Sequence, residues 1–171
     1  MTDDRTVWNF RFDRFGQSFH SRLMRRKGKD LVVFLPSLRR PGATRVDYFD
    51  RISWAAELGC SCLFVADPGL GLDPELRGSW FQGGPAFYGI ERLALDLRRI
   101  GAEFGFPEDR MLFYGSSQGG FAALALGAML PGARVLAEAP QTDVRRYRAR
   151  IEVNRMARAC YGVQTAAAIP A

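Results

Sequence analysis

Short runs of apolar residues alternate with longer stretches of helical periodicity along most of this chain. Four of the runs are continuous, as in strands buried on both faces of a parallel sheet: 31–35, 62–66, 111–114 and 134–137. Ahead of them, residues 7–12 alternate apolar and polar side chains, which predicts a half-buried strand. After a turn at 15–17, residues 18–24 are a candidate return strand, so the two form a hairpin.

Helical segments are expected between the buried runs. A first helix is predicted over 47–58, with Asp47 as its N-cap and Gly59 as its stop. Residues 90–104 carry one apolar stripe, and the small residues of 121–130 form a further helix. The alternation of strands and helices predicts an α/β fold with three layers and a mainly parallel sheet. The Gly- and Pro-rich segment 67–85 is a long loop, and such loops inside compact domains are usually functional.

The corner between the third buried run and the next helix carries a chemical motif, Gly115-Ser116-Ser117-Gln118-Gly119. In a nucleophile elbow a serine stands at the apex of a sharp strand-to-helix turn, in a strained conformation that exposes its oxygen. The apex leaves no space for side chains two residues to either side, which fits Gly115 and Gly119. Ser117 is therefore the predicted nucleophile.

An oxyanion hole should accompany this serine. The backbone N–H of Gln118, at the positive end of the helix, is one predicted donor. The second should come from the loop after run 31–35, where Pro36 has no N–H and Ser37 or Leu38 is the candidate. The alternative is a phosphate or nucleotide cradle at Gly115–Gly120, but neither G-x-x-x-x-G-K-[ST] nor G-x-G-x-x-G is present.

The catalytic base is missing from the pattern. In this type of fold the triad runs Ser, then Asp or Glu, then His, yet the one histidine, His20, precedes Ser117 by nearly a hundred residues. Asp143 is a candidate triad acid, although an N-cap of an Arg-rich helix beginning near Val144 is the favoured role. No strand is legible after residue 140, and the tail 164–171 fits neither a strand nor a packed helix. The sheet is expected to lack its C-terminal strands. Of the two explanations, a truncated hydrolase and a non-catalytic relative, truncation is favoured.

Composition narrows the function further. The net charge is +6, from 22 Arg and 2 Lys against 18 acidic residues, and the basic side chains concentrate between 145 and 158 without a nucleic-acid motif.

No apolar run reaches the ~20 residues of a membrane span, and the N-terminus lacks a signal peptide, so a cytoplasmic location is expected. Cys60, Cys62 and Cys160 form neither a disulfide framework nor a zinc pattern. No cofactor, metal or nucleic-acid partner is expected.

The segment from Tyr114 to Leu124, YGSSQGGFAAL, resembles the elbow of the α/β-hydrolase superfamily. The pieces 66–68, 78–83 and 139–143 are similar to bacterial hydrolase-like proteins linked to capsular and surface polysaccharide production. These resemblances imply an esterase or acyltransferase that acts on a glycan or its acyl groups, with Ser117 as nucleophile and an acid and a His downstream. This chain departs from the pattern at the base.

The expected organisation is a hydrolase-like core over 1–143, followed by an Arg-rich helix and tail over 144–171. Within the core, 1–30 form the N-terminal strands and 31–143 the parallel βα units. Trp80 and Phe81 either wall an acyl or sugar pocket or cap the core. An unfinished sheet would expose an edge strand, so self-association is expected. A non-catalytic scaffold in polysaccharide biosynthesis is the competing functional class.

Overall fold

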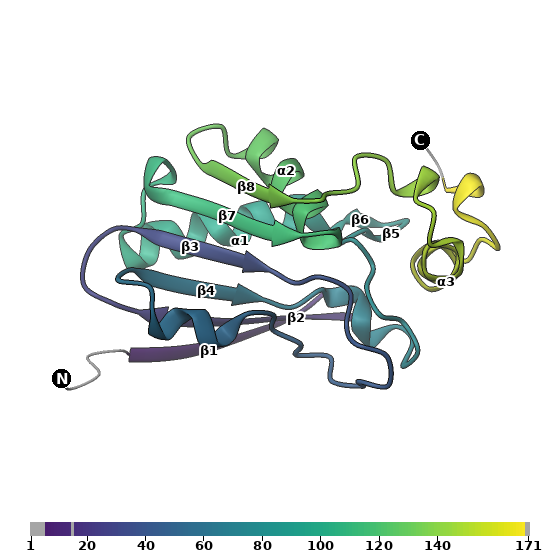
Figure 1. Ribbon diagram of the computed structural model, residues 1–171, viewed down its shortest axis with the longest axis horizontal. Coiled ribbons are helices and arrows are strands. Elements are labelled where there is room, and N and C mark those ends of the chain that lie inside the picture. Colours follow the sequence, from purple (N-terminus) through teal and green to yellow (C-terminus); the bar gives the residue numbers. More distant parts are fainter. Residues whose placement is uncertain (1–5, 15, 170–171) are drawn as a thin grey trace.

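A computed structural model describes residues 6–14 and 16–169 of the chain. Its centre is a six-stranded mixed sheet in the order β1-β2-β4-β3-β7-β8 (Figure 1). The hairpin β1–β2 is antiparallel and β2 also pairs antiparallel with β4, whereas β4, β3, β7 and β8 run parallel. The strands are β1 (Thr6–Arg14), β2 (Gln17–Arg25), β3 (Leu31–Leu35), β4 (Ser61–Val65), β7 (Met111–Ser116) and β8 (Arg134–Glu138). The predicted mainly parallel α/β sheet is confirmed, and the predicted turn at 15–17 includes Phe15, which lies outside the described residues.

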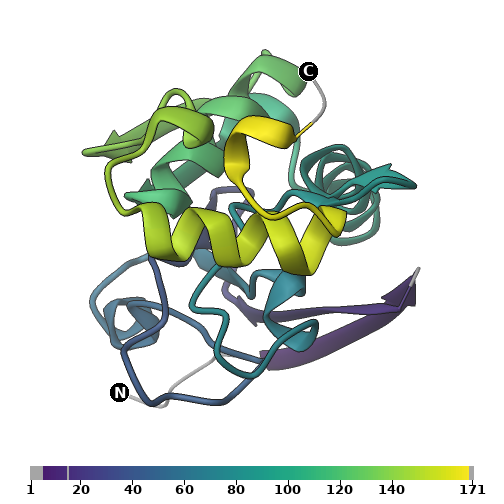
Figure 2. The same ribbon diagram turned by 90° about the vertical axis from the view of Figure 1, so that its right-hand side faces the viewer.

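Helices cover the two faces of this sheet unequally. Helices α1 (Gly89–Phe104) and α2 (Gln118–Met129) pack on one face, where the largest hydrophobic cluster lies. The opposite face carries only the short 3₁₀ helix η1 (Ile52–Ala56). Helix α3 (Arg150–Tyr161) lies beyond the carboxyl ends of the parallel strands (Figure 2). The remaining elements are η2 (Pro68–Gly71), β5 (Gly83–Gly84), β6 (Phe87–Tyr88), η3 (Glu108–Arg110), η4 (Val144–Arg146) and η5 (Ala166–Ala168).

The predicted helix over 47–58 is wrong, because only Ile52–Ala56 are helical, as the 3₁₀ helix η1. Asp47 forms an ion pair with Arg45 instead of capping a helix. Arg51 then adopts a left-handed backbone with φ 55°, which an α-helix does not accommodate. Its guanidinium lies over the rings of Trp54 and Tyr114. The left-handed Arg51, together with its contact to Tyr114 of β7, interrupts the helical periodicity of the segment.

The C-terminal region differs from its prediction as well. The Arg-rich helix begins at Arg150 and not near Val144, since residues 144–146 form the separate turn η4. Within the tail, η5 is wound and the Ala166 N–H donates to the Asn154 side chain at 3.0 Å. Ala166 is buried in a second cluster together with residues of α3 and Trp80. The described part of the tail is therefore packed, whereas residues 170 and 171 lie outside the described residues.

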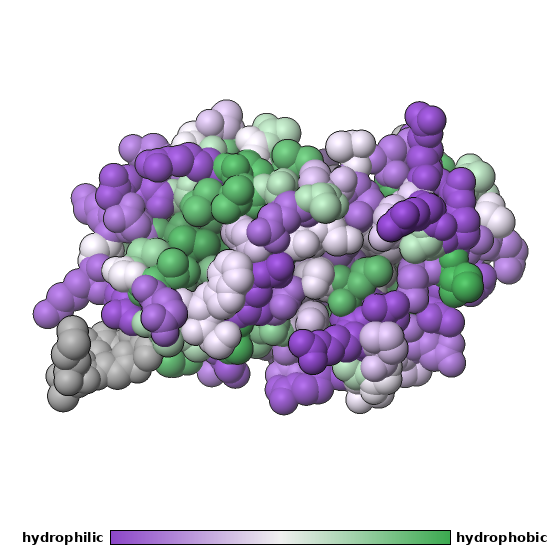
Figure 3. Space-filling model, viewed as in Figure 1, coloured by the Kyte–Doolittle hydropathy of each residue, from purple (hydrophilic) through white to green (hydrophobic). Residues whose placement is uncertain are grey.

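Strand β8 is an edge of the sheet, and its outer face is open. Leu136 is 51% exposed on the face that carries η1, and hydrophobic surface extends over β7 and β8 on this side (Figure 3). Trp54 of η1 is 45% exposed beside it. The expected self-association through this edge stays a prediction. No helix in the described ranges is long and apolar enough to cross a membrane.

Candidate functional site

Ser117 occupies the corner between β7 and α2 in a strained backbone conformation. Its φ of 54° and ψ of −118° fall in a region that residues with a Cβ rarely adopt. Two backbone hydrogen bonds hold the corner: the Ser117 N–H donates to the Glu138 carbonyl at 2.9 Å, and the Phe121 N–H donates to the Ser117 carbonyl at 3.0 Å. The serine is thus held at the carboxyl end of the parallel strands, where open α/β sheets bind ligands.

The flanking glycines are required by close backbone packing. A Cβ on Gly115 would lie 2.2 Å from the Gly119 backbone, and one on Gly119 would lie 2.3 Å from the Leu35 carbonyl oxygen. No side chain fits at such distances. The chain's own backbone therefore fills the space beside both glycines, which favours an elbow over an open phosphate cradle.

The hydroxyl of Ser117 contacts an amide and not an imidazole. Gln141 Nε2 donates to Ser117 Oγ at 3.1 Å, and the buried Trp80 Nε1 donates to Gln141 Oε1 at 2.9 Å. An indole N–H can only donate, so it fixes the orientation of the Gln141 amide and directs its NH₂ group to Ser117. In this arrangement Ser117 Oγ accepts a hydrogen bond, and Gln141 cannot take up its proton.

A buried carboxylate holds Trp80 in place. Asp67 follows β4 and accepts hydrogen bonds from the Ser79 N–H at 2.5 Å, from the Ser79 hydroxyl and from the Gly69 N–H at 3.1 Å. Burial raises the pKa of Asp67, while these hydrogen bonds oppose the shift. Trp80 and Phe81, which follow Ser79 in the chain, have φ angles of 52° and 55°. The loop that presents the indole is therefore a rigid, strained support.

The predicted oxyanion donors meet different environments. Gln118 is the first residue of α2, so its backbone N–H lies in the first turn of the helix. Its side chain is buried and accepts a hydrogen bond from the Trp80 N–H at 3.2 Å. Ser37 donates both its N–H and its hydroxyl to Asp50, at 3.3 and 2.7 Å, which engages the amide elsewhere. The Leu38 amide is consequently the stronger second candidate. The packing of Gly119 on Leu35 brings this loop next to the elbow.

Neither polar candidate for the rest of a triad contacts Ser117. His20 lies on β2, three positions from β7 in the sheet, which corresponds to about 14 Å at ordinary strand spacing. Asp143 accepts the Arg145 N–H at 2.9 Å as the N-cap of η4 and pairs with the Arg145 side chain. Asp143 is thus an N-cap, but of η4 and not of the Arg-rich helix, which begins at Arg150. Among the described residues no group of three His, Cys, Asp or Glu side chains could hold a metal ion.

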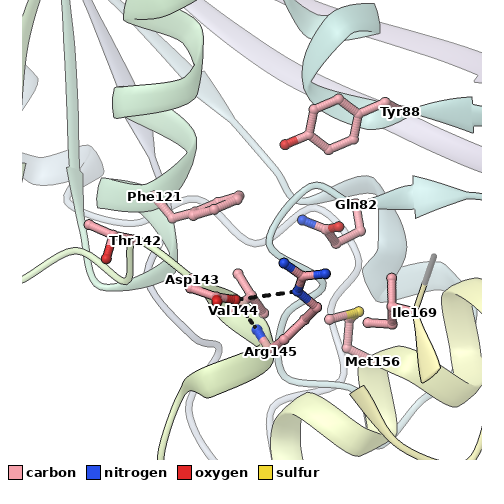
Figure 4. Close-up of a pocket in the computed structure, with 9 residues that line it drawn as sticks. All are labelled: Gln82, Tyr88, Phe121, Thr142, Asp143, Val144, Arg145, Met156 and Ile169. Carbon is pink, nitrogen blue, oxygen red and sulfur yellow. Dashed lines mark hydrogen bonds and ion pairs between the residues drawn. The ribbon is translucent and has the colours of Figure 1, made fainter. Parts of the chain in front are cut away.

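A cavity of about 420 Å³ opens beside Phe121, near the start of α2 (Figure 4). Phe121, one turn after Ser117, and Tyr88 contribute aromatic rings, while Gln82, Thr142 and Arg145 contribute polar groups. Burial raises the pKa of the Tyr88 hydroxyl to about 12, so the group stays protonated and can donate a hydrogen bond. This mixture of aromatic faces and hydrogen-bonding groups suits a sugar or an acyl chain.

Trp80 and Phe81 do not wall an open pocket, because both are fully buried. Phe81 belongs to the main core and Trp80 to the cluster around α3, which agrees with the alternative that they cap the core. Sequence reasoning missed Gln141 and the Asp67–Ser79 contact as parts of the site. The only signal was that both fall within the segments that resemble polysaccharide-associated proteins.

Solved structures that align with this chain include a glycosylation-associated complex, an acetyltransferase and an α/β hydrolase. The glycosylation-associated protein (Gap123) complex of Streptococcus agalactiae aligns with a TM-score of 0.70 at 16% identity, over 94% of this chain and 31% of that chain. The capsule O-acetyltransferase of Neisseria meningitidis serogroup A aligns with a TM-score of 0.61 at 18% identity, over 86% of this chain and 62% of that chain. The α/β hydrolase GrgF of Penicillium sp. sh18 aligns with a TM-score of 0.50 at 20% identity, over 79% of this chain and 46% of that chain.

These alignments concern the fold, and this chain spans less than two thirds of the length of each of the three proteins. No family model matches the sequence, and no curated protein matches it either. The fold is of the α/β-hydrolase type, with a mixed, mainly parallel six-stranded sheet in a chain of 171 residues. The resemblance seen in the elbow segment is thus confirmed at the level of the fold.

Proposed function

We propose that this chain carries the nucleophile and oxyanion-binding part of a serine esterase or acyltransferase that acts on an ester of a surface glycan. Ser117 Oγ attacks the ester carbonyl, and the N–H groups of Gln118 and Leu38 stabilise the oxyanion that forms. The ester C–O bond then breaks, the alcohol leaves with the proton of the serine hydroxyl, and water or a sugar hydroxyl cleaves the acyl-Ser117 ester in a second step. The similar capsule O-acetyltransferase supports a glycan as the partner of the acyl group. The cavity beside Phe121 receives the sugar or the acyl chain.

The observation that carries this proposal is the interlocked elbow. Ser117 keeps its strained φ of 54° because Gly115 and Gly119 pack backbone against backbone beneath it. Strain of this kind costs about 1–3 kcal/mol and concentrates at functional sites. A serine held in this way, at the start of a helix and at the carboxyl ends of parallel strands, is typical of a nucleophile.

The base for Ser117 is proposed to come from outside the residues that surround it here. Gln141 occupies the position next to Oγ, and an amide has no basic nitrogen. The same observation favours a second candidate function, a hydrolase-like scaffold without catalysis. In that case Gln141 replaces the base permanently and the elbow serves only the fold.

Covalent labelling by a fluorophosphonate probe distinguishes the two functions. We expect the folded wild-type chain to be labelled slowly, since the oxyanion donors are in place and the base is not. Ser117→Ala should abolish this labelling, and Ser116→Ala is the matched control because the neighbouring hydroxyl lies outside the apex. Circular dichroism of each variant checks that the fold is retained.

Each outcome has a distinct meaning. Labelling that Ser117→Ala removes and Ser116→Ala preserves would support a nucleophile poised for an external base. Labelling of both variants would mean that another residue reacts, and no labelling of a folded sample would favour the scaffold. Adding imidazole should accelerate labelling of Ser117 if only the base is missing, and an unchanged rate would count against that explanation.

A further inference from the structure

A second groove, of about 560 Å³, is lined by residues 139–143 and 146–148, which follow β8 and include Gln141. Its wall carries the arginines Arg146 and Arg148, both exposed, with the half-buried Tyr147 between them. The backbone here is ordered: the Arg146 N–H donates to the Asp143 carbonyl at 3.2 Å, and Arg148 accepts the Arg150 N–H at 2.8 Å. The two guanidinium groups therefore extend from a fixed turn.

The acidic groups near this groove are engaged with other cations. Asp143 pairs with Arg145 at 3.5 Å, and Glu138 pairs with Arg51 at 3.3 Å and accepts the Tyr114 hydroxyl. Within the described ranges no ion pair joins a carboxylate to Arg146 or Arg148. The groove thus presents two uncompensated positive charges next to the site.

A third groove gives a measure of how unusual this is. It has nearly the same volume, about 550 Å³, and is also lined by two arginines, Arg77 and Arg155. Its arginines are neutralised, because Arg77 pairs with Glu152 at 3.1 Å and Arg155 pairs with Glu75 at 3.2 Å. The two grooves have similar size and cation content and differ in the acidic partners of those cations.

We infer that the groove of Arg146 and Arg148 binds an oxyanion carried by the sugar substrate. This inference deepens the proposed function, on which it rests for the identification of a sugar. Guanidinium groups bind phosphate and carboxylate through paired, charge-assisted hydrogen bonds. Gln141 lines the groove and its amide lies 3.1 Å from Ser117 Oγ, so a sugar anchored there would hold its ester beside the nucleophile. The substrate is therefore an acidic sugar unit that carries a phosphate or a carboxylate.

Titration calorimetry of the full chain at low ionic strength tests this, with glucose 1-phosphate, glucuronate and glucose as probes up to millimolar concentration. We expect both anions to bind and glucose not to bind, and the stronger anion identifies the phosphate or carboxylate source. Arg146→Ala and Arg148→Ala should each weaken anion binding about ten-fold. Arg155→Ala, from the neutralised groove, is the matched control and should leave the affinity unchanged.

Absence of anion binding, equal binding of glucose, or an equal loss in Arg155→Ala would overturn the inference. The result is separable from that of the labelling experiment, because binding needs no reaction at Ser117. Ser117→Ala should bind the anion as the wild type does. Anion binding without labelling would leave the groove in place and refute the nucleophile, whereas labelling without anion binding would do the reverse.

Discussion

The segments that follow β7 and β8 meet at Ser117, and they are built by different means. After β7 the chain turns through an elbow at two glycines that leave no space for a side chain. A Cβ on Gly115 would lie 2.2 Å from the Gly119 backbone, and one on Gly119 would lie 2.3 Å from the Leu35 carbonyl oxygen. After β8 the chain brings Gln141 to the same oxygen through a side-chain hydrogen bond to Trp80, 61 residues away in the sequence. The first segment is specified by backbone packing, within the elbow and against Leu35 of β3, and the second by a side-chain contact.

The difference separates the position of Ser117 from the reactivity of its hydroxyl. Backbone interlocking places Ser117 whether or not chemistry occurs. The state of its hydroxyl depends on one amide, whose orientation Trp80 fixes. Variants that disturb only one of the two segments should therefore have different effects on folding and on the serine.

The largest effect is expected from Gly119→Ala. Its methyl group would lie 2.3 Å from the Leu35 carbonyl oxygen, which belongs to a central strand and cannot move aside. We expect the free energy of unfolding to fall by about 3 kcal/mol or more. Thermal and urea denaturation measure it. Gly59→Ala, where a methyl group meets nothing within 4 Å, is the control and should change stability by less than about 0.5 kcal/mol. Similar stability of the two variants would refute the interlocked elbow.

A smaller effect is expected at the second segment. Gln141→Ala leaves the buried Trp80 N–H without its acceptor, at a cost of about 1–3 kcal/mol. In a Trp80→Phe background that donor is absent, so the same substitution should cost about 1 kcal/mol less. A double-mutant cycle from denaturation curves measures the coupling. Strict additivity would mean that the indole does not hold the amide.

Ser117→Gly should stabilise the chain by about 1 kcal/mol, because glycine adopts a φ of 54° without strain. Ser116→Gly is the matched control, since Ser116 lies in β7 with ordinary strand geometry and glycine there should destabilise by roughly 0.5–1 kcal/mol. Calorimetric melting compares the two variants. A loss of stability in both would indicate that the apex is not strained.

The smallest expected effect concerns the open edge at β8. We expect the wild-type chain to show concentration-dependent sedimentation, and Leu136→Lys to shift it toward the monomer, because a charge there opposes edge-to-edge pairing. Leu124→Lys is the control, since Leu124 is 42% exposed on α2. A wild-type chain that sediments as a monomer at all concentrations would contradict the prediction.

The predictable parts of the fold are those with local causes. The buried strands, helix α1 and the need for Gly115 and Gly119 follow from hydrophobic pattern and steric space, and the structure agrees with them. The helix expected over 47–58 fails at Arg51, which has a left-handed backbone and whose guanidinium lies over Trp54 of the same segment and over Tyr114 of β7.

The site shows the same limit. The placement of Ser117 at the corner between β7 and α2 was predictable. The contact of Gln141 was not, because a glutamine after a strand carries no periodic or spacing signal. Its role arises only once Asp67 and Ser79 have positioned Trp80. Residues whose function passes through a distant partner are invisible to patterns within one segment.

The glycine interlock also bears on how this sequence can drift. A side chain at Gly115 or Gly119 would clash with the backbone and destabilise the fold. Selection for folding alone would therefore retain both glycines even after a loss of activity. Folding exerts no such pressure on the hydroxyl of Ser117, whose side chain forms hydrogen bonds with Gln141 alone among the described residues. Among descendants of this chain, persistence of the glycines would therefore record ancestry, and persistence of the serine would record continued use.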